Sequence, residues 1–194
     1  NVASQGQPDF YVKGVPATTT APELEVSQPR IYFGESAESQ EYVVVNSLQE
    51  EVDYPLSTEG QSVAYTNYSG QGGVGIGSFF QRLGFSLRYS ELNLMISNQL
   101  SDDSKIIMER NITSRVKKAA PFLYTDNDPY LALIEGNLFW IIDMYTVSDK
   151  YPYAQPADTR RINERSGLPI NFNYIRNSVK AVVNAYDGTM DFYV

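Results

Sequence analysis

Two stretches in which a glycine separates strand-like runs constrain the fold of this chain most. In "YLALIEGNLFWIIDMYTVS", residues 130–148, Gly136-Asn137 lies between two runs of apolar, β-branched and aromatic residues. In "KAVVNAYDGTMDFYV", residues 180–194, Asp187-Gly188 has the same setting. Tight hairpin turns need positive φ angles, which glycine adopts without steric cost. The sequence therefore predicts two β-hairpins.

Further short elements precede the hairpins. Three more strand-like runs are "RIYFGE" at 30–35, "EYVVVNS" at 41–47 and "SVAYTNY" at 62–68. A helix is expected to begin near Ser78, a candidate N-cap, and a second helix is expected over 111–120, where Pro121 ends it. Many strands with few helices predict an α+β fold, a mainly antiparallel sheet with β-hairpins and one or two helices.

The domain organisation is expected to be simple. Residues 1–29 are predicted to be an extended N-terminal segment and a connector rich in proline and threonine, and 30–194 an α+β domain. The stretch 149–173 is rich in Pro, Asp, Arg and Asn, which predicts a long surface excursion. The chain begins with Asn1 and ends inside the apolar run "MDFYV", so we expect it to be an excised fragment. It contains no 18-residue apolar run and is expected not to span a membrane itself.

The residue types that are missing exclude much chemistry. The chain has no cysteine and no histidine, which excludes disulfides, thiolate metal sites, cysteine nucleophiles and imidazole acid–base catalysis. An enzyme would have to use carboxylates, tyrosine, lysine or an oxygen-bound metal, and we expect no cofactor and no metal. With 23 acidic against 15 basic residues, the net charge of −8 argues against a nucleic-acid partner.

The glycine run Gly70–Gly77 lies between a strand-like and a helix-like segment and formally satisfies GxGxxG. The preceding run is polar, whereas a central parallel strand is continuously apolar. Glu91 lies within or just after the predicted helix, whereas the ribose-binding carboxylate should end a second strand. We interpret the run as a loop shaped by backbone geometry, with an anion site at the following helix N-terminus as the alternative.

Two acidic motifs are interpreted as turns. The run "AYDGTMD" resembles the DxDGT motif of aspartyl-phosphate phosphatases, but Ala185 stands where the nucleophilic aspartate should be, so a hairpin turn is favoured. In "YTDNDPY", Asp126 and Asp128 have the spacing of a calcium loop without its remaining ligands. An Asp-Pro turn is favoured there.

The remaining candidate site residues are charged side chains near strand-like runs. Glycoside hydrolysis would need two carboxyl groups in one cleft, and the candidates are Glu35, Glu51, Asp53, Asp128 and Asp143. We expect Arg110, Arg115 and Arg176 to pair with Asp128, Asp143 or Asp53. The candidate polar cluster is therefore Glu35, Asp53, Asp128, Asp143, Arg110 and Arg176. Trp140 is expected to anchor the core. Most of the 15 tyrosines and 9 phenylalanines are expected to lie in the core, but tyrosine in such number is also typical of surfaces that stack ligands or bury a partner.

Several long segments carry a resemblance to a known family. They include "GQPDFYVKGVP", "PRIYFGE", "YSGQGGVGIGSFFQRLGFSLRYSELNLMIS", "DSKIIMERNITSRVKKAAPFLYTDNDPYLALIEGNLFWIIDMYTVSDKYPYA" and "NYIRNSVKAVVNAYDGTMDFYV". Together they resemble the extracytoplasmic region of the UPF0182 family of bacterial and cyanobacterial membrane proteins, over nearly the whole chain. The resemblance implies transmembrane helices upstream, a position on the extracytoplasmic side of the cell membrane, and more of the same region downstream. It implies no activity.

Three functions are therefore open. The first is a non-catalytic module of a multi-span envelope protein that mediates assembly or ligand contact. Its partners would be the protein's own transmembrane helices and downstream soluble region, a second copy, or another envelope protein. The alternative is a carboxylate-based hydrolase of envelope glycans. The third is nucleotide or anion binding through Gly70–Gly77.

Overall fold

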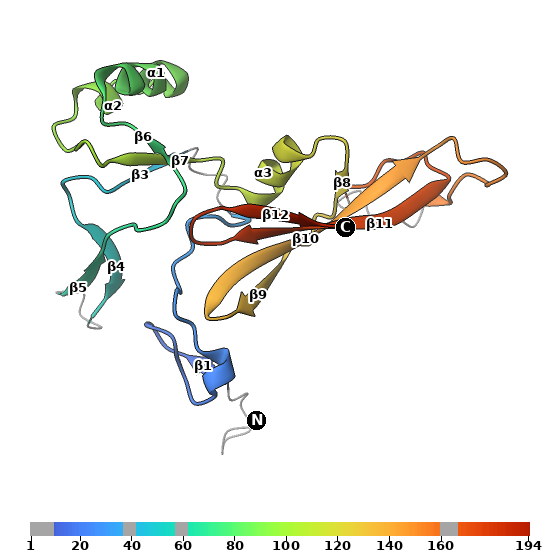
Figure 1. Cartoon of the computed structure of the whole chain (residues 1–194), viewed down its shortest axis with the longest axis horizontal. Helices are drawn as coiled ribbons and strands as arrows, with labels where there is room; N and C mark the ends of the chain where they lie inside the picture. The colour runs from blue at the N-terminus through green and yellow to red at the C-terminus, as the bar shows by residue number, and fades with distance from the viewer. Residues whose placement is uncertain (1–9, 37–41, 57–61, 160–166) are drawn as a thin grey trace. The chain divides into compact units, whose positions relative to one another are not determined.

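The computed structural model describes residues 10–36, 42–56, 62–159 and 167–194 (Figure 1). It divides the chain into two compact units, Asn1–Ser39 with Glu109–Val194, and Gln40–Met108. The predicted α+β class is confirmed, because the strands pair antiparallel and are accompanied by few helices. The predicted boundary near residue 30 stays a prediction. None of the described helices is long and apolar enough to cross a membrane.

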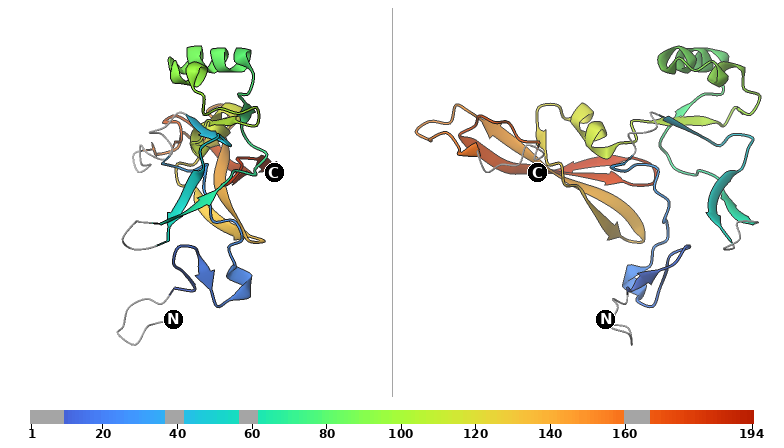
Figure 2. Two further views of the ribbon diagram at one scale, coloured as in Figure 1. Left: turned by 90° about the vertical axis from the view of Figure 1, so that its left-hand side faces the viewer. Right: turned by 180° about the vertical axis from the view of Figure 1, so that it is seen from behind.

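The first unit is built on a five-stranded sheet with the order β12-β11-β10-β8, in which β9 also pairs with β10. Its strands are β8 (Tyr124–Thr125), β9 (Tyr130–Ile134), β10 (Asn137–Ser148), β11 (Tyr174–Asn184) and β12 (Met190–Tyr193). β10 and β11 form the long ribbon seen in Figures 1 and 2. The predicted excursion 149–173 joins their distal ends.

Both predicted hairpins are confirmed, but the first turn lies one residue earlier than predicted. Glu135 (φ 50°) and Gly136 (φ 79°) are both left-handed, as a two-residue turn matching the strand twist requires. Asn137, predicted to be in the turn, already pairs with Ile134 in the sheet.

The second hairpin turn is held by its own polar side chains. The Asp187 carboxylate accepts hydrogen bonds from the amide (2.9 Å) and the hydroxyl (2.7 Å) of Thr189. The Asn184 side chain accepts from the amide of Tyr186 at 2.8 Å, and Gly188 has φ 71°. The interpretation of "AYDGTMD" as a turn is confirmed.

The core of the first unit lies on one face of the β10–β11 ribbon. Ile142 and Met144 on β10 are fully buried, as are Ala181 and Val183 on β11. Ile142 lies directly opposite Ala181, so their side chains share a face of the sheet. The predicted second helix is confirmed as α3 (Ile112–Ala119), which buries Ile112 and Val116 one turn apart.

Phe33 completes this core from a segment whose predicted structure is wrong. The run 30–35, predicted as a strand, contains only an isolated bridge between Gly34 and Asn111. The amides of Tyr32 and Phe33 instead donate to the carbonyl oxygen of Ala185, at 2.9 and 3.0 Å. The Phe33 side chain is only 1% exposed. The backbone of residues 30–35 is therefore hydrogen-bonded to the second hairpin, and the Phe33 ring fills the core. We call this segment the Phe33 plug.

Two side chains cover the Phe33 plug. The Trp140 indole N–H donates to the Phe33 carbonyl oxygen at 2.9 Å, and the Arg115 guanidinium carbon lies 4.9 Å from the centre of the Phe33 ring. Trp140 is half-buried and lies opposite the buried Val183, at the border of the core in which the sequence placed it. It covers the plug because its indole N–H needs a hydrogen-bond acceptor.

The second unit contains a small sheet, a hairpin and two helices. The sheet has the order β3-β7-β6 and the hairpin joins β4 to β5. The elements are β3 (Tyr42–Val45), β4 (Glu51–Pro55), β5 (Val63–Thr66), β6 (Val74–Gly75), α1 (Phe79–Tyr89), α2 (Asn93–Ile96) and β7 (Lys105–Met108). Ile76, Leu94 and Ile106 form its buried core. The strands predicted at 41–47 and 62–68 are confirmed within their described residues.

The helix start predicted at Ser78 is confirmed. Its hydroxyl accepts from the Gln81 amide at 3.4 Å, and the Gln81 side chain accepts from the Ser78 amide at 3.2 Å, which is a capping box. In the N-terminal segment, β1 (Val12–Lys13) pairs with β2 (Thr18–Thr19) and is followed by the 3₁₀ turn η1 (Pro22–Leu24).

Candidate functional site

The face of the β10–β11 ribbon opposite the core carries a linked set of polar side chains. Asp143 on β10 lies opposite Lys180 on β11, and their side chains form an ion pair. The same carboxylate oxygen of Asp143 accepts from the Asn177 amide at 3.1 Å. The hydrogen bond from Lys180 holds the pKa of Asp143 below its usual range, although burial acts in the opposite direction. Asp143 is therefore a carboxylate at neutral pH.

A second link joins Tyr145 to Asp126. The Tyr145 hydroxyl donates to one carboxylate oxygen of Asp126 at 3.3 Å, and the other oxygen accepts from the amide of Asp128 at 3.2 Å. The Asp126 amide donates to the Asp143 carbonyl oxygen at 2.8 Å, which ties the two links together. Burial, followed by the charges of Asp126 and Asp143, raises the pKa of Tyr145, so its hydroxyl stays a donor.

Exposed tyrosines surround these groups. Tyr124 lies opposite Tyr145, and Tyr193 lies opposite Lys180, so each shares that face with its partner. Tyr130 lies close enough to act electrostatically on Lys180. The exposed fractions of Tyr124, Tyr130 and Tyr193 are 40%, 48% and 60%. We call this surface the tyrosine face: Tyr124, Asp126, Tyr130, Asp143, Tyr145, Asn177, Lys180 and Tyr193.

The tyrosine face includes one of the residues that the sequence predicted as a polar cluster, and a second one adjoins it. Asp143 is part of the face, and Asp128 contributes its amide to the Asp126 carboxylate. Asp143 pairs with Lys180, so the arginine partner predicted for it is wrong. Arg176 lies on β11 opposite Thr146 and is exposed.

The other predicted residues lie elsewhere. The bridge between Gly34 and Asn111 brings the backbones of Glu35 and Arg110 together: the Asn111 side chain donates to the Glu35 carbonyl oxygen at 2.7 Å. Arg110 donates to the Tyr32 carbonyl oxygen at 2.7 Å, and burial lowers its pKa. Asp53 and Glu51 are on β4 of the second unit, where Glu51 accepts from the Asn46 amide at 2.9 Å.

Sequence reasoning missed Lys180, Asn177 and Tyr145, and it treated Asp126 only as a turn residue. A partial signal was present in "IDMY", where Asp143 and Tyr145 alternate with apolar residues, whereas "RNSVK" carries three consecutive polar residues and does not alternate. The Asp128 amide donates to the Asp126 side chain, which forms an Asx-type turn just before the predicted Asp-Pro turn. The Asp-Pro turn itself stays a prediction. Among the described residues there is no group of three or more acidic side chains that could hold a metal ion.

The glycine run serves the fold of the second unit. Val74 and Gly75 form β6 and pair with Ile106 and Lys105 of β7. The Ile76 amide donates to the Ser104 carbonyl oxygen at 2.9 Å. Gly73 has φ 92°, and a Cβ on Gly77 would lie 2.7 Å from the Asp102 carbonyl oxygen. These observations support the interpretation as a loop shaped by backbone geometry.

Replacing two glycines by alanine is expected to give changes of opposite sign. Gly77→Ala should lower the free energy of unfolding by about 1–3 kcal/mol, because the new Cβ meets the Asp102 backbone. Gly84→Ala should raise it by up to about 1 kcal/mol, because Gly84 lies inside α1 with open space around it and alanine is the better helix former. Urea denaturation of the two variants measures both changes. If Gly77→Ala left the free energy of unfolding unchanged, the close approach of residue 77 to the Asp102 backbone would not be what requires glycine in this loop.

The stability of the tyrosine face is expected to depend on pH. Because folding depresses the pKa of Asp143, its contribution is complete above the unfolded pKa of about 3.9 and is lost as pH falls through the folded pKa. Asp143→Asn should therefore cost up to about 1 kcal/mol near pH 7, since Lys180 is partly exposed, and less below about pH 4. Urea denaturation between these pH values measures the difference. If the loss of stability caused by Asp143→Asn increased as the pH fell, the ion pair would be contradicted.

Comparison with known proteins identifies a matching family and several relatives of the chain. The model of an uncharacterised protein family, UPF0182, matches residues 1–194. UPF0182 proteins of Desulfitobacterium hafniense, Trichodesmium erythraeum and Pelotomaculum thermopropionicum are 46%, 43% and 41% identical to the chain. Each alignment covers 99–100% of the chain but only 18–21% of the relative. No solved structure matches the chain.

Proposed function

Because the chain belongs to the UPF0182 family and spans about a fifth of the length of its curated relatives, we propose that it is a non-catalytic contact module of a longer protein. We propose that this longer protein is a multi-span membrane protein of the bacterial envelope, with the module on the extracytoplasmic side. The contact is made by the tyrosine face, and its occupant is the rest of the same protein or another envelope protein.

The composition of the tyrosine face supports contact. Tyrosine is enriched at protein interfaces because its ring contributes apolar area and its hydroxyl keeps a hydrogen bond. Tyr124, Tyr130 and Tyr193 are all exposed, so their rings are available to a partner. Asp143 and Lys180 already neutralise each other, so a partner could cover them without burying an uncompensated charge.

The protonation states of this face do not suit glycan hydrolysis. A glycosidase needs one carboxyl group whose raised pKa lets it donate a proton. The pKa of Asp143 is lowered, and the raised pKa of Tyr145 keeps its hydroxyl protonated. Neither group exchanges a proton near neutrality. The electrostatics therefore favour a contact surface over the hydrolase alternative.

Site-specific photocrosslinking tests the contact. A photoreactive phenylalanine analogue replaces Tyr193 or Tyr130 in the full-length protein in its native cells, and Tyr65, which is exposed on β5, serves as the matched control. We expect both tyrosine-face positions to crosslink to the same protein segment, identified by mass spectrometry, and Tyr65 not to reach it. Absence of a specific product at both positions would refute the contact surface.

Protease accessibility tests the location separately. In intact spheroplasts, an external protease should cleave a site engineered into the loop between β10 and β11 of the full-length protein. Cleavage that required lysis of the spheroplasts would place the module in the cytoplasm and overturn the proposed location. The crosslinking result would stand on its own in that case.

A further inference from the structure

The distal end of the β10–β11 ribbon carries a loop that one side chain clamps. The Asn173 side-chain oxygen accepts from the Tyr151 amide at 2.9 Å. Its side-chain amide donates to the carbonyl oxygens of Tyr151 at 2.9 Å and Ala154 at 3.3 Å. The Tyr151 ring stacks on Tyr174 of β11, with 4.8 Å between ring centroids. The turn 151–154 is thereby fixed to the end of the sheet.

This clamped turn presents Tyr153 to solvent. Tyr153 has φ 60°, a left-handed conformation that is unfavourable for a residue with a Cβ. Its side chain is fully exposed, so no contact inside the chain repays the strain. A strained residue that the surrounding structure holds in place indicates a functional constraint. A large, preorganised aromatic side chain at the end of a ribbon has the character of an interface anchor.

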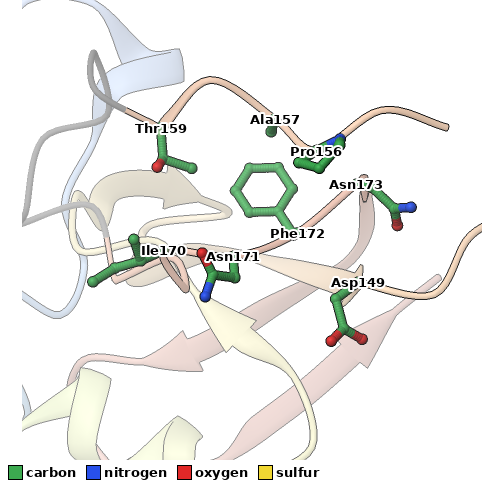
Figure 3. A pocket seen from close by; sticks show the side chains of 8 residues that line it. All are labelled: Asp149, Pro156, Ala157, Thr159, Ile170, Asn171, Phe172 and Asn173. Carbon is green, nitrogen blue, oxygen red and sulfur yellow. The ribbon is translucent and has the colours of Figure 1, made fainter.

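A pocket opens beside the same turn (Figure 3). It has a volume of about 210 Å³, and its lining residues are Asp149, Pro156, Ala157, Thr159, Ile170, Asn171, Phe172 and Asn173. Figure 3 shows the Phe172 ring facing the segment that carries Pro156, Ala157 and Thr159. The Ala157 amide donates to the Phe172 carbonyl oxygen at 2.8 Å, which closes this wall.

The lining of the pocket fits a phenol. Phe172, Ile170 and Pro156 supply apolar surface for a ring, and Asp149 supplies a carboxylate that can accept a hydrogen bond from its hydroxyl group. The volume is below the roughly 300 Å³ at which small-molecule pockets begin, so it suits a single side chain better than a metabolite. The ligand class indicated is a tyrosine side chain.

We propose that this pocket binds Tyr153 of a second copy of the chain, and that two copies exchange this residue reciprocally. The anchor and the pocket lie on the same loop, with Pro156 only three residues after Tyr153, so one two-fold axis can satisfy both contacts. Tyr153 and the pocket that binds it thus belong to one self-complementary surface. The tyrosine face shares no residue with it, so the two proposals can fail separately.

Self-association of the full 194-residue chain tests the exchange. We expect sedimentation velocity to show a dimer whose dissociation constant lies between about 10 µM and about 1 mM, as is suited to a small interface. Tyr153→Ala should lower the association constant by more than about tenfold, because it removes both anchors. The matched control is Tyr65→Ala, which removes an exposed tyrosine from the other unit and should leave association unchanged.

Mixing two defective variants gives the decisive result. Ala157→Leu fills the pocket and leaves Tyr153 intact, whereas Tyr153→Ala leaves the pocket intact. Each variant alone should be monomeric, and a mixture should form a heterodimer through the one remaining contact. Asp149→Ala replaces Ala157→Leu in this mixture if the latter does not fold by circular dichroism.

A tyrosine analogue tests whether the pocket binds a tyrosine side chain at all, apart from whether that side chain comes from a second copy of the chain. N-acetyltyrosinamide should shift the NMR resonances of Thr159 and Ile170 in Tyr153→Ala and should not shift them in Ala157→Leu. A chain that stays monomeric to about 1 mM, or a mixture that does not associate, overturns the exchange. That holds even if the probe binds, since the tyrosine would then come from a different protein.

Discussion

Replacing Phe33 by alanine is expected to lower the free energy of unfolding of the first unit by about 3–5 kcal/mol. The ring is 1% exposed, and Phe33 is the largest fully buried side chain among the described residues. Its removal leaves a cavity beneath the second hairpin and takes away the surface on which the Arg115 guanidinium lies. The loss is a large fraction of the stability of a typical domain, so we expect partial unfolding at 37 °C.

Urea denaturation followed by Trp140 fluorescence measures this loss, because the indole donates to the Phe33 carbonyl oxygen. The control is Phe122→Ala, since Phe122 is 78% exposed and its truncation should change stability by no more than about 0.5 kcal/mol. Phe33→Leu should fall between the two because it retains part of the buried apolar volume. Equal effects of Phe33→Ala and Phe122→Ala would show that the plug is not part of the core.

The second large effect is expected for Gly188→Ala, at about 2–5 kcal/mol. Gly188 has φ 71°, which costs an alanine about 1–2 kcal/mol. A Cβ there would also lie 2.5 Å from the Phe33 ring, and overpacking of a core costs about 1–3 kcal/mol. Both terms act in the same direction. The loss is measured in the same urea experiment.

A double-mutant cycle separates the two terms. In Phe33→Ala the ring is absent, so Gly188→Ala should then cost only the backbone term. We expect the double variant to be more stable than the sum of the single variants predicts, by about 1–3 kcal/mol. Strict additivity would mean that the ring does not limit the space at residue 188, and that only the φ angle makes glycine necessary there.

The parts of the fold that local sequence determines could be predicted. Gly136 and Gly188 permit turns, Ser78 begins a helix and Pro121 follows one, and each effect acts within a few residues. The first turn was misplaced by one residue because both Gly136-Asn137 and Glu135-Gly136 are acceptable turn pairs. The register of the sheet, which sequence reasoning could not supply, decides between them.

The Phe33 plug could not be predicted, because the information lies far from it in sequence. "RIYFGE" has the composition of a strand, yet its amides are satisfied by the Ala185 carbonyl oxygen instead of a neighbouring strand. Only the position of the second hairpin makes this arrangement available. Tertiary context overrides local propensity for such segments.

The candidate site was predicted in part for the same reason. Asp143 could be selected from its place in a strand-like run, but its partner Lys180 comes from the next strand, beyond the loop 149–173. The ladder also shifts register between Met144 and Tyr145, which places Asn177 opposite Tyr145. An irregularity of one residue changes which side chains share a face and leaves no clear signal in the sequence.

The bond between the Phe33 segment and Ala185 also bears on how the chain matures on the ribosome. Residues 40–108 form one of the two compact units, and the contacts within it do not require the residues that follow it. Residues 30–35 emerge earlier but have no place to dock until the hairpin around Ala185 has been synthesised. Between the synthesis of Phe33 and that of Ala185, the Phe33 side chain lacks its docking site, and transiently exposed apolar segments of this kind are the ones that chaperones protect.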